Sequence, residues 1–320
     1  MTPSPSTSLP TRTTSFAFAL ALAIITHLLW GFFPLFFRLL EPADPIEIIV
    51  YRAGWGMVFC ILLLALLGRW SDLILAVSNR QILWRLSAAG FLIVINWTVY
   101  VHAVLSGHTT DAALGYFINP LMTVALGLVV LRERLTFLQK IAVALGALAV
   151  VVLILGLGRL PWVSLVLPLT FALYSLVKKD VAPSVGPIEG MTVETAVVTP
   201  FLLGYLAYLA YSQSTSFHVL AATSSSWQPH LALLMGAGII TMIPLFLYAK
   251  AAQGLPLGVM GFIQYISPVM QLVIGVWFFR ETMEPTRWLA TGIIWCALAV
   301  LTIDFARQVH RRRKLLGAAR

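Results

Sequence analysis

The sequence predicts an all-α polytopic membrane protein with ten transmembrane helices, arranged as two inverted five-helix repeats. Three observations lead to this prediction: an apolar composition, ten apolar segments of membrane-spanning length, and a similarity between the two halves of the chain. Of the 320 residues, 60% are apolar and only 10% are charged, whereas soluble domains carry about 25% charged residues. Water is therefore not the main solvent of this chain.

The ten apolar segments give the predicted spans. Crossing a hydrocarbon core of roughly 30 Å takes about 20 residues of helix, and a backbone in lipid must satisfy its own hydrogen bonds, so each segment is expected to be helical. The connections are short, and we expect no soluble domain. The predicted spans are 15–38, 45–67, 84–105, 110–131, 137–157, 160–177, 190–211, 230–249, 256–279 and 287–306.

The positions of lysine and arginine predict the orientation, because cytoplasmic loops retain positive charge. With the N-terminus inside, most of the 21 Lys and Arg residues lie on the cytoplasmic side, including those of the basic tail, 307–320. We therefore predict a bacterial inner-membrane protein whose two tails, 1–14 and 307–320, are cytoplasmic. The tail and the net charge of +9 also suggest nucleic acid, but anionic lipid attracts such a tail equally well. The lipid bilayer is the expected partner.

The two halves of the chain resemble one another. A shift of 148 residues aligns them without a gap over roughly sixty positions, which is the mark of an internal repeat. A weaker match at a shift of 142 joins Pro45–Glu47 to Pro187–Glu189. The predicted repeats are 15–157 and 158–306. Residues that coincide at the shift of 148 include Gly90 and Gly238, Pro120 and Pro268, Arg132 and Arg280, and Glu133 and Glu281.

An odd number of helices in each repeat reverses the direction of the chain, so the second repeat is predicted to be inverted in the membrane. Inverted repeats are a recurring plan of secondary transporters, which bind substrate near the middle of the bilayer between the halves. We therefore expect a secondary transporter that works by alternating access, with a small-molecule substrate as its partner.

Four segments of the chain also carry a resemblance to a known family. They are His27–Arg38 (HLLWGFFPLFFR), Gly115–Leu121 (GYFINPL), Leu131–Arg134 (LRER) and Gly261–Pro268 (GFIQYISP). On these segments the chain resembles the EamA-type transporters of the drug/metabolite transporter superfamily, and within them the RarD-like branch. The resemblance extends over essentially all ten spans. It implies a permease for metabolites or drugs that is linked to chloramphenicol sensitivity or resistance.

Two polar stripes are the main candidates for a substrate cavity, because polar groups within spans are costly in lipid. Each stripe occupies one helical face, and the shift of 148 superimposes them. Pro120 and Pro268 lie beside them and each frees a backbone carbonyl. Hydrogen-bonded packing between helices is the alternative. The stripes comprise Tyr116, Asn119 and Thr123 in the fourth span and Gln264, Ser267 and Gln271 in the ninth.

Further aromatic and amide side chains are expected to complete this cavity. Aromatic rings can stack on a substrate or line the membrane interface, and a lone Asn can bind a substrate or a neighbouring helix. Both interpretations stay open at this point. The residues are Trp30, Asn96, Trp97, Tyr100, Tyr174, Tyr248 and Tyr265.

Two charged residues lie well inside predicted spans, Arg52 in the second and Glu194 in the seventh. They coincide at the shift of 142, and each would be costly alone. We hypothesise that they form an ion pair across the two halves, either as a structural pair or as a proton-sensitive latch. Asp111 and His102 lie nearer helix ends and are candidates for a gate.

Several motifs of other classes of protein are missing from the sequence. It contains no P-loop, no HExxH motif and no cluster of cysteines, so we expect neither a nucleotide-driven pump nor an enzyme, and no cofactor or metal site. A membrane receptor or scaffold that transports nothing is the alternative function. The internal duplication favours a transporter over it.

Overall fold

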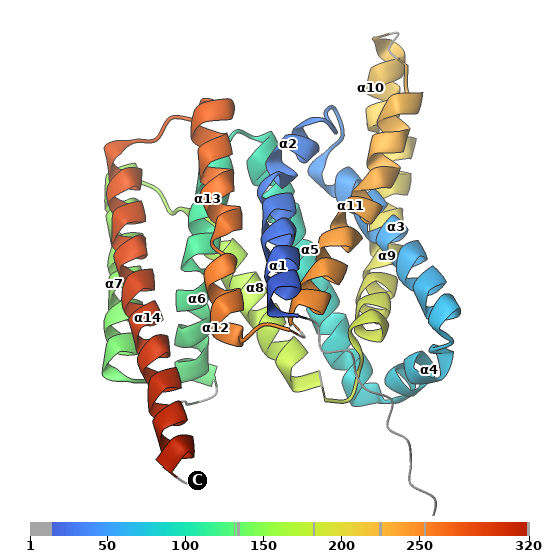
Figure 1. Cartoon of the computed structure of the whole chain (residues 1–320). Helices are drawn as coiled ribbons and strands as arrows, with labels where there is room; N and C mark the ends of the chain where they lie inside the picture. The colour runs from blue at the N-terminus through green and yellow to red at the C-terminus, as the bar shows by residue number, and fades with distance from the viewer. Residues whose placement is uncertain are drawn as a thin grey trace, which may run out of the picture.

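The computed structural model describes residues 15–130, 132, 135–181, 183–223, 226–252 and 254–318, a bundle of helices without a strand in these ranges (Figure 1). The all-α prediction is confirmed. In chain order the helices are α1 (Phe16–Gly31), α2 (Phe33–Arg38), α3 (Pro45–Leu67), α4 (Trp70–Ser78), α5 (Arg80–Leu105), α6 (Thr109–Val130), α7 (Phe137–Leu157), α8 (Trp162–Val181), α9 (Pro187–Tyr211), α10 (Ser216–Ala222), α11 (Gln228–Ala252), α12 (Leu257–Ile263), α13 (Ile266–Val273), the π-helix η1 (Ile274–Phe278) and α14 (Pro285–Ala318).

Ten segments of the described chain are long and apolar enough to cross a membrane, which confirms the predicted number. The first span joins α1 to α2, the seventh joins α9 to α10, and the ninth runs from α12 through η1. Two short helices were not predicted: α4 lies between the second and third spans, and α10 extends the seventh span beyond its predicted end at residue 211. Each has fewer than ten residues, which is too few to cross the bilayer. Long apolar segments, on which the prediction rests, therefore do not indicate them.

Local chemistry explains several of the helix ends. The Asp44 side chain accepts a hydrogen bond from the backbone N–H of Ile46 at 2.8 Å and caps α3, whose first residue is Pro45, a position that needs no donor. Gly68 ends the same helix with a φ of +65°, a conformation that glycine adopts without strain. At the start of α7, Thr136 and Gln139 form a reciprocal capping box.

The helices pack in a pattern that is consistent with two related halves. The first span contacts α11 and α13, and the corresponding sixth span, α8, contacts α5 and α6. Gly90 lies against the backbone of Glu194, and its repeat partner Gly238 lies against Trp55. Arg132 and Arg280, also repeat partners, both adopt a left-handed backbone, with φ values of 53° and 56°. Few non-glycine residues do so.

Two spans are interrupted along their length. The first changes from α1 to α2 at Phe32, two residues before Pro34. The ninth breaks at Gln264 and Tyr265, because Pro268 cannot donate a hydrogen bond to the Gln264 carbonyl and its ring pushes that carbonyl away. Broken helices of this kind are typical of the substrate sites of transporters.

Candidate functional site

Arg52 lies in α3 with 5% of its surface exposed, surrounded by aromatic rings. Its guanidinium carbon is 4.1 Å from a ring centroid of Trp97 on α5, and 5.5 Å and 5.7 Å from those of Phe37 and Phe33 on α2. Cation–π attraction stabilises a buried guanidinium in such a place. Arg52 and Trp97 were predicted as site residues from the sequence. The two phenylalanines were not, because nothing distinguishes them from the other apolar residues of the first span.

Glu194 has a different partner from the one predicted. One carboxylate oxygen accepts a hydrogen bond from Lys178 Nζ at 2.6 Å, and the other accepts one from the Tyr174 hydroxyl at 3.2 Å. The ion pairs found among the described residues do not include one between Arg52 and Glu194, so the structure corrects that hypothesis. The physical reason is that α8 continues to Val181, beyond the predicted end at residue 177, and carries Lys178 to the buried carboxylate.

Two residues of the ninth-span stripe hold this span against the first. The Ser267 hydroxyl donates to the His27 carbonyl at 2.8 Å, and Gln271 Nε2 donates to the Trp30 carbonyl at 3.2 Å. Because the Ser267 proton is used, His27 Nδ1, 3.0 Å from Ser267 Oγ, must be the donor of that contact. These contacts match the packing alternative for Ser267 and Gln271.

The other predicted residues fall into several places. Asn96 donates to the Leu167 carbonyl at 2.8 Å and ties α5 to α8. The rings of Trp30 and Tyr248 lie 5.7 Å apart, and those of Tyr100 and Tyr116 lie 5.5 Å apart.

Three of the remaining residues, Thr123, Gln264 and Tyr265, lie away from these clusters. Thr123 and Gln264 are exposed, so the structure does not place them in the interior. Tyr265 lines a separate cavity of about 240 Å³ together with Phe117 and Trp295. The stripes predicted from the sequence are therefore divided between the interior and the periphery of the bundle.

The interior also holds buried polar atoms from both halves that have no hydrogen-bond partner within the described residues. Buried polar groups in proteins normally have a partner, so these atoms are candidates for contact with water or a bound molecule. They are Nε2 of His27, Nε and Nη1 of Arg52, the hydroxyl of Tyr100, Oδ1 of Asn119 and Oε1 of Gln271.

A network at one end of the bundle joins the two halves. The Glu281 carboxylate accepts hydrogen bonds from the backbone N–H groups of Thr109 and Thr110 at 2.7 Å and 2.8 Å, at the start of α6. Asp111 of α6 lies 3.4 Å from Nε of Arg287 on α14. Contacts of a carboxylate with a helix N-terminus are favourable, so this network holds α6 to the second half.

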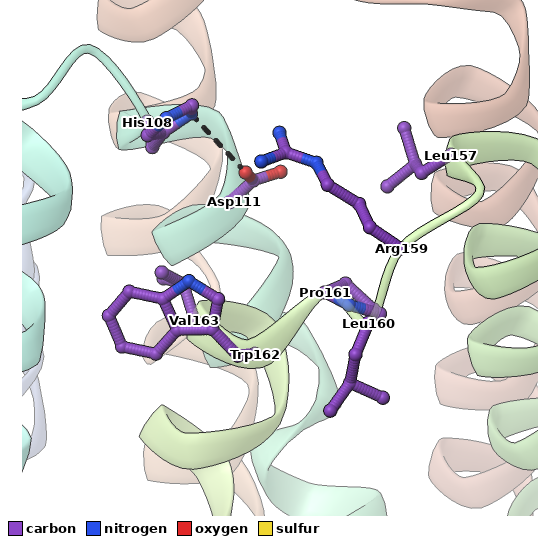
Figure 2. A pocket seen from close by; sticks show the side chains of 8 residues that line it. All are labelled: His108, Asp111, Leu157, Arg159, Leu160, Pro161, Trp162 and Val163. Atoms are coloured by element: carbon purple, nitrogen blue, oxygen red, sulfur yellow. Dashed lines mark ion pairs between the residues drawn. The ribbon is translucent and has the colours of Figure 1, made fainter.

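Figure 2 shows the surroundings of Asp111. His108 Nδ1 lies 3.6 Å from Asp111 Oδ2, and the Arg159 guanidinium points toward the same carboxylate. These residues border a small cavity of about 30 Å³ with Trp162. The sequence suggested Asp111 as a gate residue and missed its partner Arg287, although an arginine in an apolar span is a signal in itself.

Glu47 was not predicted as a site residue, because it lies at the start of α3 rather than well inside a span. Glu47 is fully buried and accepts hydrogen bonds from the N–H and hydroxyl of Ser216, at 3.0 Å and 2.9 Å. Its repeat partner Glu189 is buried beside Arg69, with Nε of Arg69 3.1 Å from the carboxylate. The 142-residue match contained both glutamates. Each joins one half of the chain to the other.

The fold and this interior define a polytopic helical membrane protein of the transporter type, in which elements of both halves enclose buried polar and charged groups. The chain belongs to the EamA-like transporter family, whose family model matches twice, over residues 17–155 and 161–303. The two matched ranges fall within the two repeats predicted from the sequence.

Similar proteins come from several bacteria. A protein named RarD from Streptomyces exfoliatus is 39% identical over 91% of this chain and 90% of its own length. An uncharacterized transporter from Pseudomonas aeruginosa is 40% identical over 90% of this chain and 94% of its own length. One solved crystal structure has a TM-score of 0.56 at 17% identity and covers 89% of this chain and 97% of its own chain. That last likeness concerns the fold alone.

Proposed function

We propose that the chain is a secondary transporter of small organic molecules that works by alternating access. The observation that carries the proposal is the set of unpartnered buried polar atoms contributed by both halves of an EamA-family protein. Buried polar atoms need water or a ligand, and transporters built from inverted repeats bind substrate between the halves. The interior around Arg52, Tyr100 and Asn119 is the substrate site of this proposal.

The network around Glu281 and Asp111 closes one side of this site. By the charge distribution this end of the bundle is the periplasmic side, with both termini in the cytoplasm and the protein in a bacterial inner membrane. In an alternating cycle the contacts of Glu281 with α6 and of Asp111 with Arg287 break when the outer side opens. The bilayer and the transported molecule are the partners in this proposal, and nucleic acid is not.

The alternative is a receptor or scaffold that carries nothing across the membrane. It shares the helical fold, but it gives no reason for two related halves, which are a recurring plan of secondary transporters. In the described residues no group of three or more His, Cys, Asp or Glu is arranged to hold a metal ion.

Flux into proteoliposomes tests the proposal. The purified chain is reconstituted and offered a panel of tritiated metabolites and drugs, with and without a pH gradient, beside liposomes that lack protein. We expect protein-dependent uptake of at least one compound. Uptake equal to that of empty liposomes for the whole panel would support the receptor or scaffold instead.

A cross-link across the outer network tests alternating access. Asp111 and Arg287 are both replaced by Cys after the native Cys60 and Cys296 have been substituted, and the pair is joined by a short reducible bis-thiosulfonate reagent. We expect the cross-link to stop flux and a reductant to restore it. Single-cysteine variants treated with the same reagent are the control, and undiminished flux through the cross-linked protein contradicts the mechanism.

The resemblance to RarD-like permeases extends the proposal to chloramphenicol. We expect expression of the chain to change the chloramphenicol susceptibility of a host that lacks its own relative of this family. The measurement is the minimum inhibitory concentration with and without expression. An unchanged value at verified membrane expression would remove this compound from the substrate class.

A further inference from the structure

We propose that Arg52 recognises the charge of the transported molecule, which is a small organic acid bound as its monoanionic carboxylate. This inference rests on the proposed function and gives it a substrate class. The carboxylate head contacts Arg52 and Tyr100, and the apolar body of the acid lies against the aromatic rings beside them.

The first step is that Arg52 has no counter-charge. Nε and Nη1 of its guanidinium are buried and have no hydrogen-bond partner in the described part of the chain. None of the ion pairs found there includes this residue. Arginine stays protonated at any physiological pH, and an isolated charge within a membrane span is costly. A bound anion would accept hydrogen bonds from these donors and would also neutralise the charge.

The second step concerns the aromatic rings around the guanidinium. Trp97, Phe33 and Phe37 attract a cation through their π faces. They offer no oxygen that could accept a hydrogen bond from its N–H groups. The rings therefore hold the cation in place and leave its donors free. The planar donor fork of arginine matches the two oxygens of a carboxylate.

The third step supplies a second donor and an aromatic surface for the apolar body. The Tyr100 hydroxyl is buried without a partner in the described residues, and it belongs to the ring that packs 5.5 Å from the ring of Tyr116. A tyrosine hydroxyl donates well to a carboxylate. The rings of Trp97, which lies over the guanidinium, and Tyr116, which packs on Tyr100, are the flat apolar surfaces that the body of the acid contacts in this proposal.

Another arginine of the same chain shows what a satisfied site looks like. Arg38 also lies over an aromatic ring, 5.4 Å from the centroid of Phe279. Unlike Arg52, it forms an ion pair with Glu41 and donates to the Leu105 carbonyl at 3.0 Å. Arg38 is therefore the matched control: it has the same type of ring contact, but its charge already has a partner.

Binding to the purified full-length chain in lipid nanodiscs tests the proposal. The ligands are three carboxylates and their uncharged carboxamides: acetate and acetamide, benzoate and benzamide, and indole-3-acetate and indole-3-acetamide. Affinity is measured by isothermal titration calorimetry. We expect at least one carboxylate to bind ten times more tightly than its amide. If no carboxylate in the panel binds better than its amide, the proposal is overturned, and this comparison needs no variant.

Variants of three residues test whether Arg52 causes the preference for a carboxylate over its amide. In Arg52→Gln we expect the carboxylate to bind at least ten times more weakly and the preference over the amide to disappear, whereas Arg52→Lys keeps the preference at lower affinity. Arg38→Gln should bind as the unmodified chain does. A preference that survives in folded Arg52→Gln overturns the assignment. If Arg52→Gln does not fold, a carboxylate preference lost in Tyr100→Phe supports the site and an unchanged one overturns it.

The outcome for the anion site is separate from the outcome for transport. Tight carboxylate binding without any flux would leave the site in place and remove the transport function. Protein-dependent flux of amides, with no preference for carboxylates, would leave the transporter in place and remove the anion site.

Discussion

Lys178 and Glu194 provide the most direct test of how this bundle holds a buried charge. Replacing Lys178 by Met removes the ammonium group that lies 2.6 Å from the Glu194 carboxylate. The Glu194 side chain, which is only 3% exposed, then has no counter-charge from Lys178. Breaking a buried pair by removing one partner costs about 3–5 kcal/mol. Because the Lys178 side chain is 28% exposed, water already weakens the pair, so we expect the lower end of that range.

The double variant separates the pair from its individual charges. The double variant K178M/E194Q removes both charges and keeps an amide oxygen that can accept the hydrogen bond of the Tyr174 hydroxyl. We expect its free energy of unfolding to fall by only about 1 kcal/mol, the usual net value of a neutral hydrogen bond. The double variant should therefore lose roughly 2 kcal/mol less than K178M alone, and the loss measured for the single variant E194Q completes the double-mutant cycle that isolates the coupling energy. The assay is equilibrium unfolding in mixed micelles of increasing SDS content, followed by far-ultraviolet circular dichroism.

The neighbouring lysine is the control. Lys179 is exposed, and its replacement by Met should change stability by less than about 0.5 kcal/mol. Two results would refute the reasoning: losses that simply add in the double variant, or an equal loss for Lys179→Met. Arg52→Gln combined with E194Q should instead be additive, because these two residues share no contact.

Three further predictions follow from the network, the stripes and the charge distribution. Glu281→Ala removes both acceptors at the start of α6 and should destabilise the protein by about 2 kcal/mol, the upper value for a helix cap, while exposed Glu284→Ala should have little effect in the same unfolding assay. In a cysteine-free background, Tyr116→Cys should react with a water-soluble thiol reagent and Ser267→Cys should be protected, and the reverse order would contradict the packing of Ser267 on the first span. A reporter fused after Arg320 should be active in the cytoplasm, and activity of a periplasm-only reporter there would reject the topology.

The spans could be predicted because they depend on composition and length alone. Lipid requires about 20 apolar residues for each crossing, and the chain shows this ten times in the residues described. The ends of the spans were harder to predict. The third begins at Arg80 rather than at residue 84, because Asn79 caps it through its side chain, and the cap lies outside the apolar segment.

The roles of individual polar residues could be predicted only in part. A helical face can be derived from spacing, but the neighbour that it meets cannot. Ser267 and Gln271 share a face as expected, yet that face meets the backbone of α1 and its donors bond there. His27 was missed as a site residue because a single histidine in an apolar segment gives no pattern. Its role depends on Ser267, 240 positions away in the sequence.

The Arg52 and Glu194 hypothesis shows what repeat symmetry does and does not imply. Each residue lies seven positions after the proline that begins its helix, which is roughly 10 Å along the helix axis. The second and seventh of ten consecutive spans cross the bilayer in opposite directions, so these depths are measured from opposite faces. In a core of roughly 30 Å the two residues are separated along the membrane normal, and equivalent positions do not meet.

Each charge instead meets residues of the span that precedes it in the chain, and Arg52 also lies over Trp97 of the third span. The end of the sixth span brings Lys178 to Glu194, whereas the corresponding end of the first span brings the rings of Phe33 and Phe37 to Arg52. The same architecture thus neutralises the charge in the second half and leaves the charge in the first half with only π contacts. This difference between otherwise related halves is why the unpaired cation, rather than the paired carboxylate, is the group expected to meet a charged substrate.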